Sequence, residues 1–242
     1  MNNPPFFRRP FKYAYFYVTP CLILINAIVY FLCKFMPNLV YYLSMNVVYV
    51  IRYKMFWQFV TYMFVHGGAR HLLLNMLGLF FFGIGVERAI GSKEFILFYF
   101  TTGILSAVLS FILYYFTKSY GVFLLGASGA VYAVLFAYAV CYPRSIIYLW
   151  WVIPVPAPVM VLIFAIIEVV SGFFSTSNVA HLTHLFGFLI ALLYFIIRMG
   201  VNPLKIWKNT YKEYHPHRHL DHRRLSAGIR RTPLHPLRLL RA

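Results

Sequence analysis

Three stretches of the chain carry residue types that could perform acyl transfer. Ser128 lies between Ala127 and Gly129, where a polar loop gives way to an apolar run. A serine becomes a nucleophile when a base takes its proton, and histidine is the usual base because its pKa lies near operating pH. Two histidines, His181 and His184, lie near the start of a later apolar run. The sequence therefore offers one serine and two candidate bases.

A third stretch places His71 and Asn75 near the start of another apolar run. Four residues apart on a helix, they share one face, and both can donate hydrogen bonds to a developing oxyanion. They are equally suited to hydrogen bonds between membrane helices. A metal site at His66 and His71 is a further interpretation. It lacks a His-Glu-x-x-His pattern and an acidic ligand, so we expect no metal and no cofactor.

The position of Ser128 at the start of an apolar run is itself informative. A helix N-terminus has unpaired backbone N–H groups and the positive end of the helix dipole, which can hold an oxyanion. Gly126 and Gly129 would permit a tight entry and a close approach of another backbone. Small residues such as Gly129 and Ala133 are also ordinary helix-packing devices. The motif alone therefore supports both catalysis and packing.

Acidic residues limit which catalytic arrangement the chain can build. No aspartate lies in any apolar run, and the only acid within the fifth run is Glu168, near its outer end. A Ser-His-Asp triad is therefore not available. The sequence predicts a Ser-His dyad.

Composition indicates where these residues must work. Of the 242 residues, 62% are hydrophobic and 11% are charged, whereas soluble domains are about 45–50% apolar and about 25% charged. This composition favours a helical membrane protein with little room for a soluble domain. The cysteines Cys21, Cys33 and Cys141 lie in or beside apolar runs and show no metal-ligand spacing, so we interpret them as small hydrophobic residues.

The apolar runs predict an all-α, polytopic membrane protein with six transmembrane helices. The expected spans are about 14–32, 71–89, 95–116, 126–142, 146–171 and 179–199. Prolines break the start of the fifth span, so its helix proper is expected to begin near Pro158. The aromatic connection 34–70 is expected to lie in the membrane interface and to have structure of its own.

Positive charge is concentrated at the ends of the chain. Ten of the 22 Lys and Arg residues lie beyond residue 200, and most others flank apolar runs. This distribution places both termini in the cytoplasm and argues against nucleic acid as a partner. We expect a basic N-terminus (1–13), a six-helix domain (14–199) and a basic, mobile cytoplasmic tail (200–242) close to anionic lipids. The expected location is a cell membrane, with a bacterial one favoured.

Together, these motifs resemble those of the rhomboid intramembrane serine proteases. The resemblance covers about residues 14–199, with five motifs in the same order. The motifs are Trp57-Gln58-x-x-Thr61, His66-x-x-x-x-His71-x-x-x-Asn75, Glu87-x-x-x-Gly91, Gly126-x-Ser128-Gly129 and Thr183-His184-x-x-Gly187.

The resemblance implies a role for each matching residue. Ser128 would be the nucleophile, and His71, Asn75 and the Ser128 backbone N–H would form the oxyanion hole. Tyr132 would pack against the catalytic histidine, and His66 would help to arrange the oxyanion region. Without the resemblance, Tyr132 would be interpreted as an ordinary aromatic core residue.

The same resemblance selects the base. In the family pattern a glycine follows the catalytic histidine by three positions, so that the last span packs tightly on the fourth. His184 has Gly187 at this spacing, whereas His181 has His184 there, and we therefore choose His184. Two positions depart from the family pattern. Gln58 replaces a common arginine, and Ala191 replaces a common glycine. Neither position touches the chemistry.

By resemblance, the chain would be a serine endopeptidase that cleaves transmembrane segments of other membrane proteins. Trp57 would embed in the outer leaflet, and Glu87 with Arg88 would brace a cytoplasmic turn. The main alternative is a catalytically inactive rhomboid-like protein that binds transmembrane helices, but such proteins typically lack the serine or the histidine. A transporter is disfavoured because the polar clusters lie toward one membrane face and paired intramembrane charges are missing from the sequence.

Overall fold

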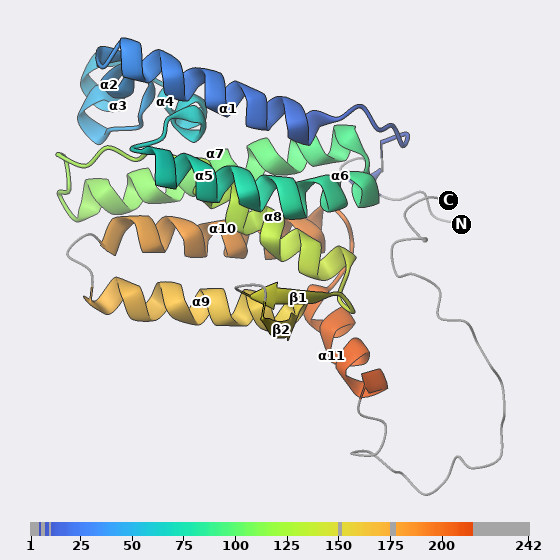
Figure 1. Ribbon diagram of the computed structural model, residues 1–242. Helices are drawn as coiled ribbons and strands as arrows, with labels where there is room; N and C mark the ends of the chain where they lie inside the picture. The colour runs from blue at the N-terminus through green and yellow to red at the C-terminus, as the bar shows by residue number, and fades with distance from the viewer. Residues whose placement is uncertain (1–4, 6–7, 10, 150–151, 175–177, 215–242) are drawn as a thin grey trace, which may run out of the picture.

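The computed structural model of the chain describes residues 5, 8–9, 11–149, 152–174 and 178–214. Its long helices lie side by side as a bundle (Figure 1). In chain order the helical segments are α1 (Val18–Phe35), α2 (Asn38–Leu43), α3 (Val47–Tyr53), α4 (Gln58–Thr61), the 3-10 turn η2 (Tyr62–Phe64), α5 (Ala69–Gly78), the π-helical segment η3 (Leu79–Gly83), α6 (Ile84–Ile90), α7 (Ser92–Phe116), α8 (Ser128–Cys141), α9 (Ala157–Phe174), α10 (Asn178–Ile197) and α11 (Pro203–Tyr214).

Four helical stretches in the described part of the chain are long and apolar enough to cross a membrane. They are α1, the continuous run from α5 through η3 to α6, α7 and α9. Helix α8 and the stretch His181–Ile197 of α10 are also apolar but shorter. At about 1.5 Å per residue, α8 would be about 21 Å long, less than the ~30 Å hydrocarbon core. The prediction of a helical membrane protein is confirmed, and the number of six spans stays a prediction.

Helix α8 lies at the centre of the bundle. It contacts α5 to α7 on one side and α9 to α11 on the other, and most of its side chains are buried. Its contact with α10 is tight at Gly187, where an added Cβ would lie 2.1 Å from the Gly129 carbonyl oxygen. Small residues permit this approach because the two backbones nearly touch. The predicted tight packing of the last span on the fourth is therefore observed.

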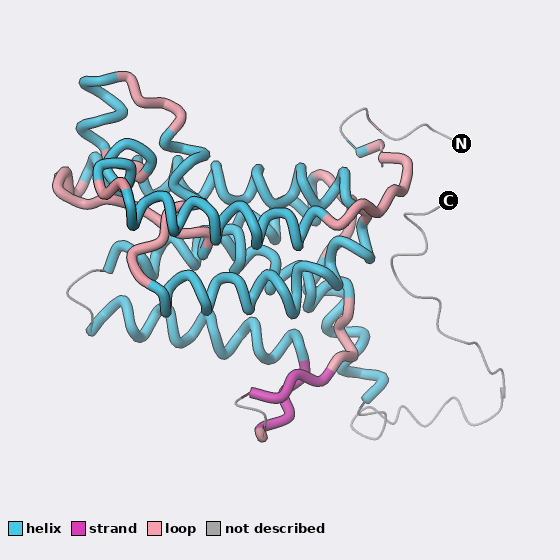
Figure 2. The backbone as a smooth tube through the Cα atoms, turned by 45° about the horizontal axis from the view of Figure 1, so that its top comes forward, coloured by secondary structure: helices cyan, strands magenta, loops and turns pink. Residues whose placement is uncertain are grey.

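The first part of the predicted fifth span, before its prolines, is not helical. The strands β1 (Ile146–Leu149) and β2 (Ile153–Pro156) pair antiparallel here as a hairpin, in which Ile147 pairs with Val155. Pro154 and Pro156 lack the N–H groups that a helix interior needs. Helix α9 begins only at Ala157, close to the expected start at Pro158. The hairpin lies at the end of α9 that is remote from α2 to α4 (Figure 2).

The first part of the predicted mobile tail is a helix. Helix α11 packs against α8 and α10, and the Trp207 indole N–H donates a 2.9 Å hydrogen bond to the Ala139 carbonyl. The charges and late prolines of the whole tail conceal the helical potential of this first part in the sequence. Residues 215–242, which contain most of the tail, lie outside the described residues.

The connection between α1 and α5 has structure of its own, as predicted. Met45 exchanges backbone hydrogen bonds of 2.9 and 2.8 Å with Leu124, and the Gly126 N–H donates to the Tyr62 carbonyl at 2.9 Å. The Asn46 amide donates to the carbonyls of residues 120 and 122. The connection therefore fixes the segment that leads into Ser128.

Glu87, at the opposite end of the bundle, caps the N-terminus of α1. Its buried carboxylate accepts hydrogen bonds from the N–H groups of Val18 and Thr19, at 2.8 and 2.9 Å, and from the hydroxyls of Thr19 and Ser92. A carboxylate is favoured at a helix N-terminus because it satisfies unpaired donors and complements the dipole. This contact agrees with the structural role predicted for Glu87.

We expect Glu87→Ala to lower the free energy of unfolding by roughly 2–4 kcal/mol, because several buried donors lose a charged acceptor. Thermal or denaturant unfolding of the detergent-solubilised protein would measure this loss. Lys93→Ala, a change at an exposed residue nearby, is the matched control. Equal stability of the two variants would contradict the capping role.

Candidate active site

Ser128 is the first residue of α8, as its sequence position predicted. Within the described part of the chain, no side chain caps this helix. The Val131 N–H donates to the Ala127 carbonyl at 2.9 Å, which begins the helical hydrogen-bond ladder. The preceding N–H groups of the first turn have no partner within the helix. The hydroxyl of Ser128 therefore lies beside donors that can hold negative charge.

His71 is brought to Ser128 across Gly126. An added Cβ at Gly126 would lie 2.8 Å from His71 Nε2 and 3.8 Å from Ser128 Oγ. The φ angle of Gly126 is +116°, a conformation that L side chains rarely adopt. Both the backbone and the space above it therefore require glycine. The structure confirms that the two segments, far apart in sequence, meet here.

Asn75 lies one helical turn after His71 and is 5% exposed. Its side-chain amide donates a 2.8 Å hydrogen bond to the backbone carbonyl of His71. An amide nitrogen carries two hydrogens, so a second donation stays possible. This hydrogen bond holds the Asn75 side chain against the backbone of its own helix, α5.

His66 packs edge-on against His71, with ring centroids 5.0 Å apart. Burial, with a smaller contribution from His71, lowers the pKa of His66 to about 4. The His66 ring is therefore neutral at pH 7 and adds no charge beside His71. The predicted arranging role of His66 stays a prediction.

His184 and Tyr132 form a stacked pair. Their ring centroids are 4.2 Å apart and their planes differ by 9°. Tyr132 lies on α8, one turn after Ser128, so it holds the ring of His184 on the helix that carries the serine. His71 approaches the start of the same helix across Gly126. The geometry thus joins the segments of Ser128, His71 and His184.

The other candidate base, His181, faces a different helix. An added Cβ at Gly172 of α9 would lie 3.7 Å from the His181 Cβ. His181 therefore packs toward α9, whereas the ring of His184 also stacks on Tyr132 of α8. This difference favours the choice of His184 over His181.

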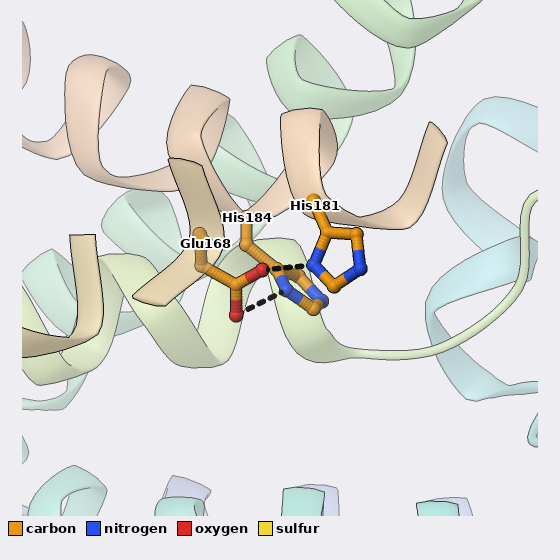
Figure 3. Close-up of side chains that lie close together, drawn as sticks. All are labelled: Glu168, His181 and His184. Atoms are coloured by element: carbon orange, nitrogen blue, oxygen red, sulfur yellow. Dashed lines mark hydrogen bonds and ion pairs between the residues drawn. The ribbon is translucent and has the colours of Figure 1, made fainter. Parts of the chain in front are cut away.

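Glu168 is the site residue that the sequence argument missed. Its carboxylate faces both histidines (Figure 3), with Oε2 2.6 Å from His181 Nδ1 and Oε1 3.0 Å from His184 Nδ1. The Tyr132 hydroxyl also donates to Oε1. The sequence shows that Glu168 is an acid in an apolar run. The spacing of residues along one helix does not show which residues of a neighbouring helix Glu168 faces.

The cluster also has the composition of a metal site. Glu168, His181 and His184 offer three ligand atoms that all lie within 4.8 Å of one another. Two imidazoles and a carboxylate are ligands that Zn²⁺ accepts. The expectation of no metal was based on His66 and His71, and it did not consider this group.

The fold and the gathered polar side chains define a class of helical membrane proteins with a serine and histidines at one site. Residues 53–200 match the family model of the Rhomboid domain. The chain belongs to the rhomboid family, as the resemblance of its motifs had indicated.

Several curated proteins are similar to the chain over part of its length. The RHOMBOID-like protein 12, mitochondrial, of Arabidopsis thaliana is 31% identical over 140 residues, which cover 51% of this chain and 41% of that protein. The Rhomboid protease AarA of Providencia stuartii is 33% identical over 117 residues, 43% of this chain and 39% of AarA. The Rhomboid protease GluP of Bacillus subtilis (strain 168) is 35% identical over 79 residues, 33% of this chain and 14% of GluP. The chain thus matches less than half the length of each of these relatives.

Proposed function

We propose that the chain is an intramembrane serine protease that cleaves transmembrane segments of other membrane proteins. Membership of the rhomboid family, with relatives named as proteases, supports a protease. The observation that carries the assignment of residues is the position of Ser128 at an uncapped helix N-terminus, with His71 across Gly126 and His184 stacked on Tyr132. Ser128 is the nucleophile and His184 is the base.

The proposed reaction proceeds in two stages. His184 takes the proton of Ser128 while Oγ attacks the peptide carbonyl, and the protonated ring then gives this proton to the leaving amine as the C–N bond breaks. The resulting acyl-enzyme is hydrolysed by water with the same base. The Ser128 N–H, His71 and Asn75 stabilise the oxyanion in both stages.

The substrate must change conformation before cleavage. A transmembrane helix hides its carbonyls in internal hydrogen bonds, so it has to unwind locally to reach Ser128. We therefore propose substrates with helix-weakening residues near a small residue at the cut.

The membrane arrangement is part of the same proposal. Six spans within residues 14–199 would place both termini in the cytoplasm of a cell, in agreement with the distribution of Lys and Arg. The site would then lie near the outer face, and the basic tail near anionic lipid. No nucleic acid is involved.

Labelling with a fluorophosphonate probe tests the proposal. This reagent phosphonylates an activated serine, so the purified wild-type protein in detergent should be labelled and Ser128→Ala should not. Unfolding curves of both proteins would verify that the variant is folded. A folded wild-type protein without labelling would favour the alternative of an inactive rhomboid-like protein that binds transmembrane helices.

A further inference from the structure

A carboxylate lies on the far side of the proposed base. Glu168 is 5% exposed and lies on α9, beside the apolar, exposed side chains of Ile166, Ile167, Val169 and Val170. An ionised carboxylate in such a region is costly unless charged or hydrogen-bonding groups surround it. Glu168 has such groups, and all of them belong to the site.

We propose that Glu168 is a positioning residue that extends the expected Ser128–His184 dyad to a Ser128–His184–Glu168 triad. This inference rests on the proposed function, since it assigns a role only if His184 is the base. A carboxylate at Nδ1 keeps the hydrogen of the neutral ring on that nitrogen and leaves Nε2 free to accept the serine proton. It also stabilises the imidazolium that forms when the proton is transferred.

The position of the carboxylate fits this role. Oε1 lies 3.0 Å from His184 Nδ1, although this buried nitrogen has no well-aligned hydrogen bond among the described residues. Catalytic hydrogen bonds are often poorly aligned without substrate and tighten in the complex. A small rotation of either side chain would align this bond.

Two neighbours hold the carboxylate in place. His181 is positioned to donate from Nδ1 to Oε2 at 2.6 Å, and the Tyr132 hydroxyl donates to Oε1. The ring of Tyr132 is also stacked on His184. Tyr132 therefore fixes both the imidazole and its carboxylate partner, and His181 has a function that does not require it to be the base.

A divalent cation is the competing occupant of the same three side chains. The hydrogen bonds favour the triad. Both oxygens of the carboxylate already accept hydrogen bonds, Oε2 from His181 and Oε1 from Tyr132, so a cation would have to compete with these donors. Binding of a metal ion is therefore one possible outcome of the experiment below.

Glu168→Gln tests the triad because it keeps the size of the side chain and removes its charge. We expect kcat for a fluorogenic transmembrane peptide to fall at least about a hundredfold with KM nearly unchanged. The acidic limb of the profile of kcat/KM against pH should move to lower pH, since a neutral amide no longer favours the protonated ring. A purely structural residue would not move this limb.

The controls separate failure of this inference from failure of the proposed function. Ser171→Ala on the same helix should retain wild-type kcat. A fully active Ser128→Ala would overturn the proposed function, whereas an inactive Ser128→Ala with a fully active Glu168→Gln would overturn only the triad. Loss of wild-type activity in a chelator, with recovery on addition of Zn²⁺, would replace the triad by a metal site.

A second variant decides the case if Glu168→Gln does not fold. Tyr132→Phe keeps the stacked ring and removes one donor to the carboxylate. A fall in kcat of about three- to tenfold without a change in KM would support the triad. Wild-type kcat in this variant would overturn the proposed positioning of His184 through Glu168.

Discussion

Replacing His184 by alanine is expected to lower kcat at least about a thousandfold, as much as Ser128→Ala does, because the nucleophile and its base act as one unit. His181→Ala should stay within about tenfold of wild type, since the contact of His181 is with the carboxylate of Glu168, which it would help to position. The measurement is cleavage of a transmembrane peptide by the three variants at equal protein concentration.

The pair of histidines provides its own control. Both lie on α10 and both contact Glu168, so a general effect of removing an imidazole from this region would affect both variants equally. If His181→Ala were inactive and His184→Ala were active, the assignment of the base along α10 would be wrong. Fluorophosphonate labelling of the same variants would also show which histidine is the base, without a peptide substrate.

Gly187→Ala is expected to damage both the fold and the activity. Its Cβ would lie 2.1 Å from the Gly129 carbonyl oxygen, and this backbone atom cannot give way as a flexible side chain could. Helices α8 and α10 would have to separate, which would move Ser128 and His184 apart. We expect a loss of roughly 1–3 kcal/mol of stability, and a fall in activity of about a hundredfold for a displacement near 1 Å.

Thermal unfolding and peptide cleavage would measure these two effects. Gly172→Ala is the matched control for stability, since it is also a helical glycine but its Cβ would meet the nearest atom at an ordinary 3.7 Å. Removal of a helical glycine at such a place is neutral or stabilising. A Gly187→Ala protein as stable and active as wild type would show that the contact of α8 with α10 is not tight in the membrane.

Much of the fold and of the site could be predicted from the sequence. Apolar runs located the long helices because burial in lipid requires continuous apolar segments. The family resemblance implied that the last span packs tightly on the fourth and that Tyr132 packs against the catalytic histidine, and the contacts at Gly187 and at His184 agree with both.

The remaining features depend on contacts between segments distant in sequence. Glu168 faces His184 only because α9 lies beside α10 with one particular rotation, and hydropathy does not specify this rotation. The hairpin at residues 146–156 was missed because its apolar residues resemble the start of a span. Helix α11 was missed because a basic composition hides its packing face.

The π-helical segment η3 divides the span that runs from Ala69 to Ile90. A wide turn of this kind acts as one inserted residue, which changes the phase of everything beyond it by about 100° relative to a continuous α-helix. His71 and Asn75 precede the wide turn, and Glu87 follows it. The span can therefore direct His71 toward Ser128 and Glu87 toward α1. An uninterrupted α-helix would not necessarily give both residues these orientations. The wide turn thus sets the direction of Glu87 relative to that of His71 within one continuous span.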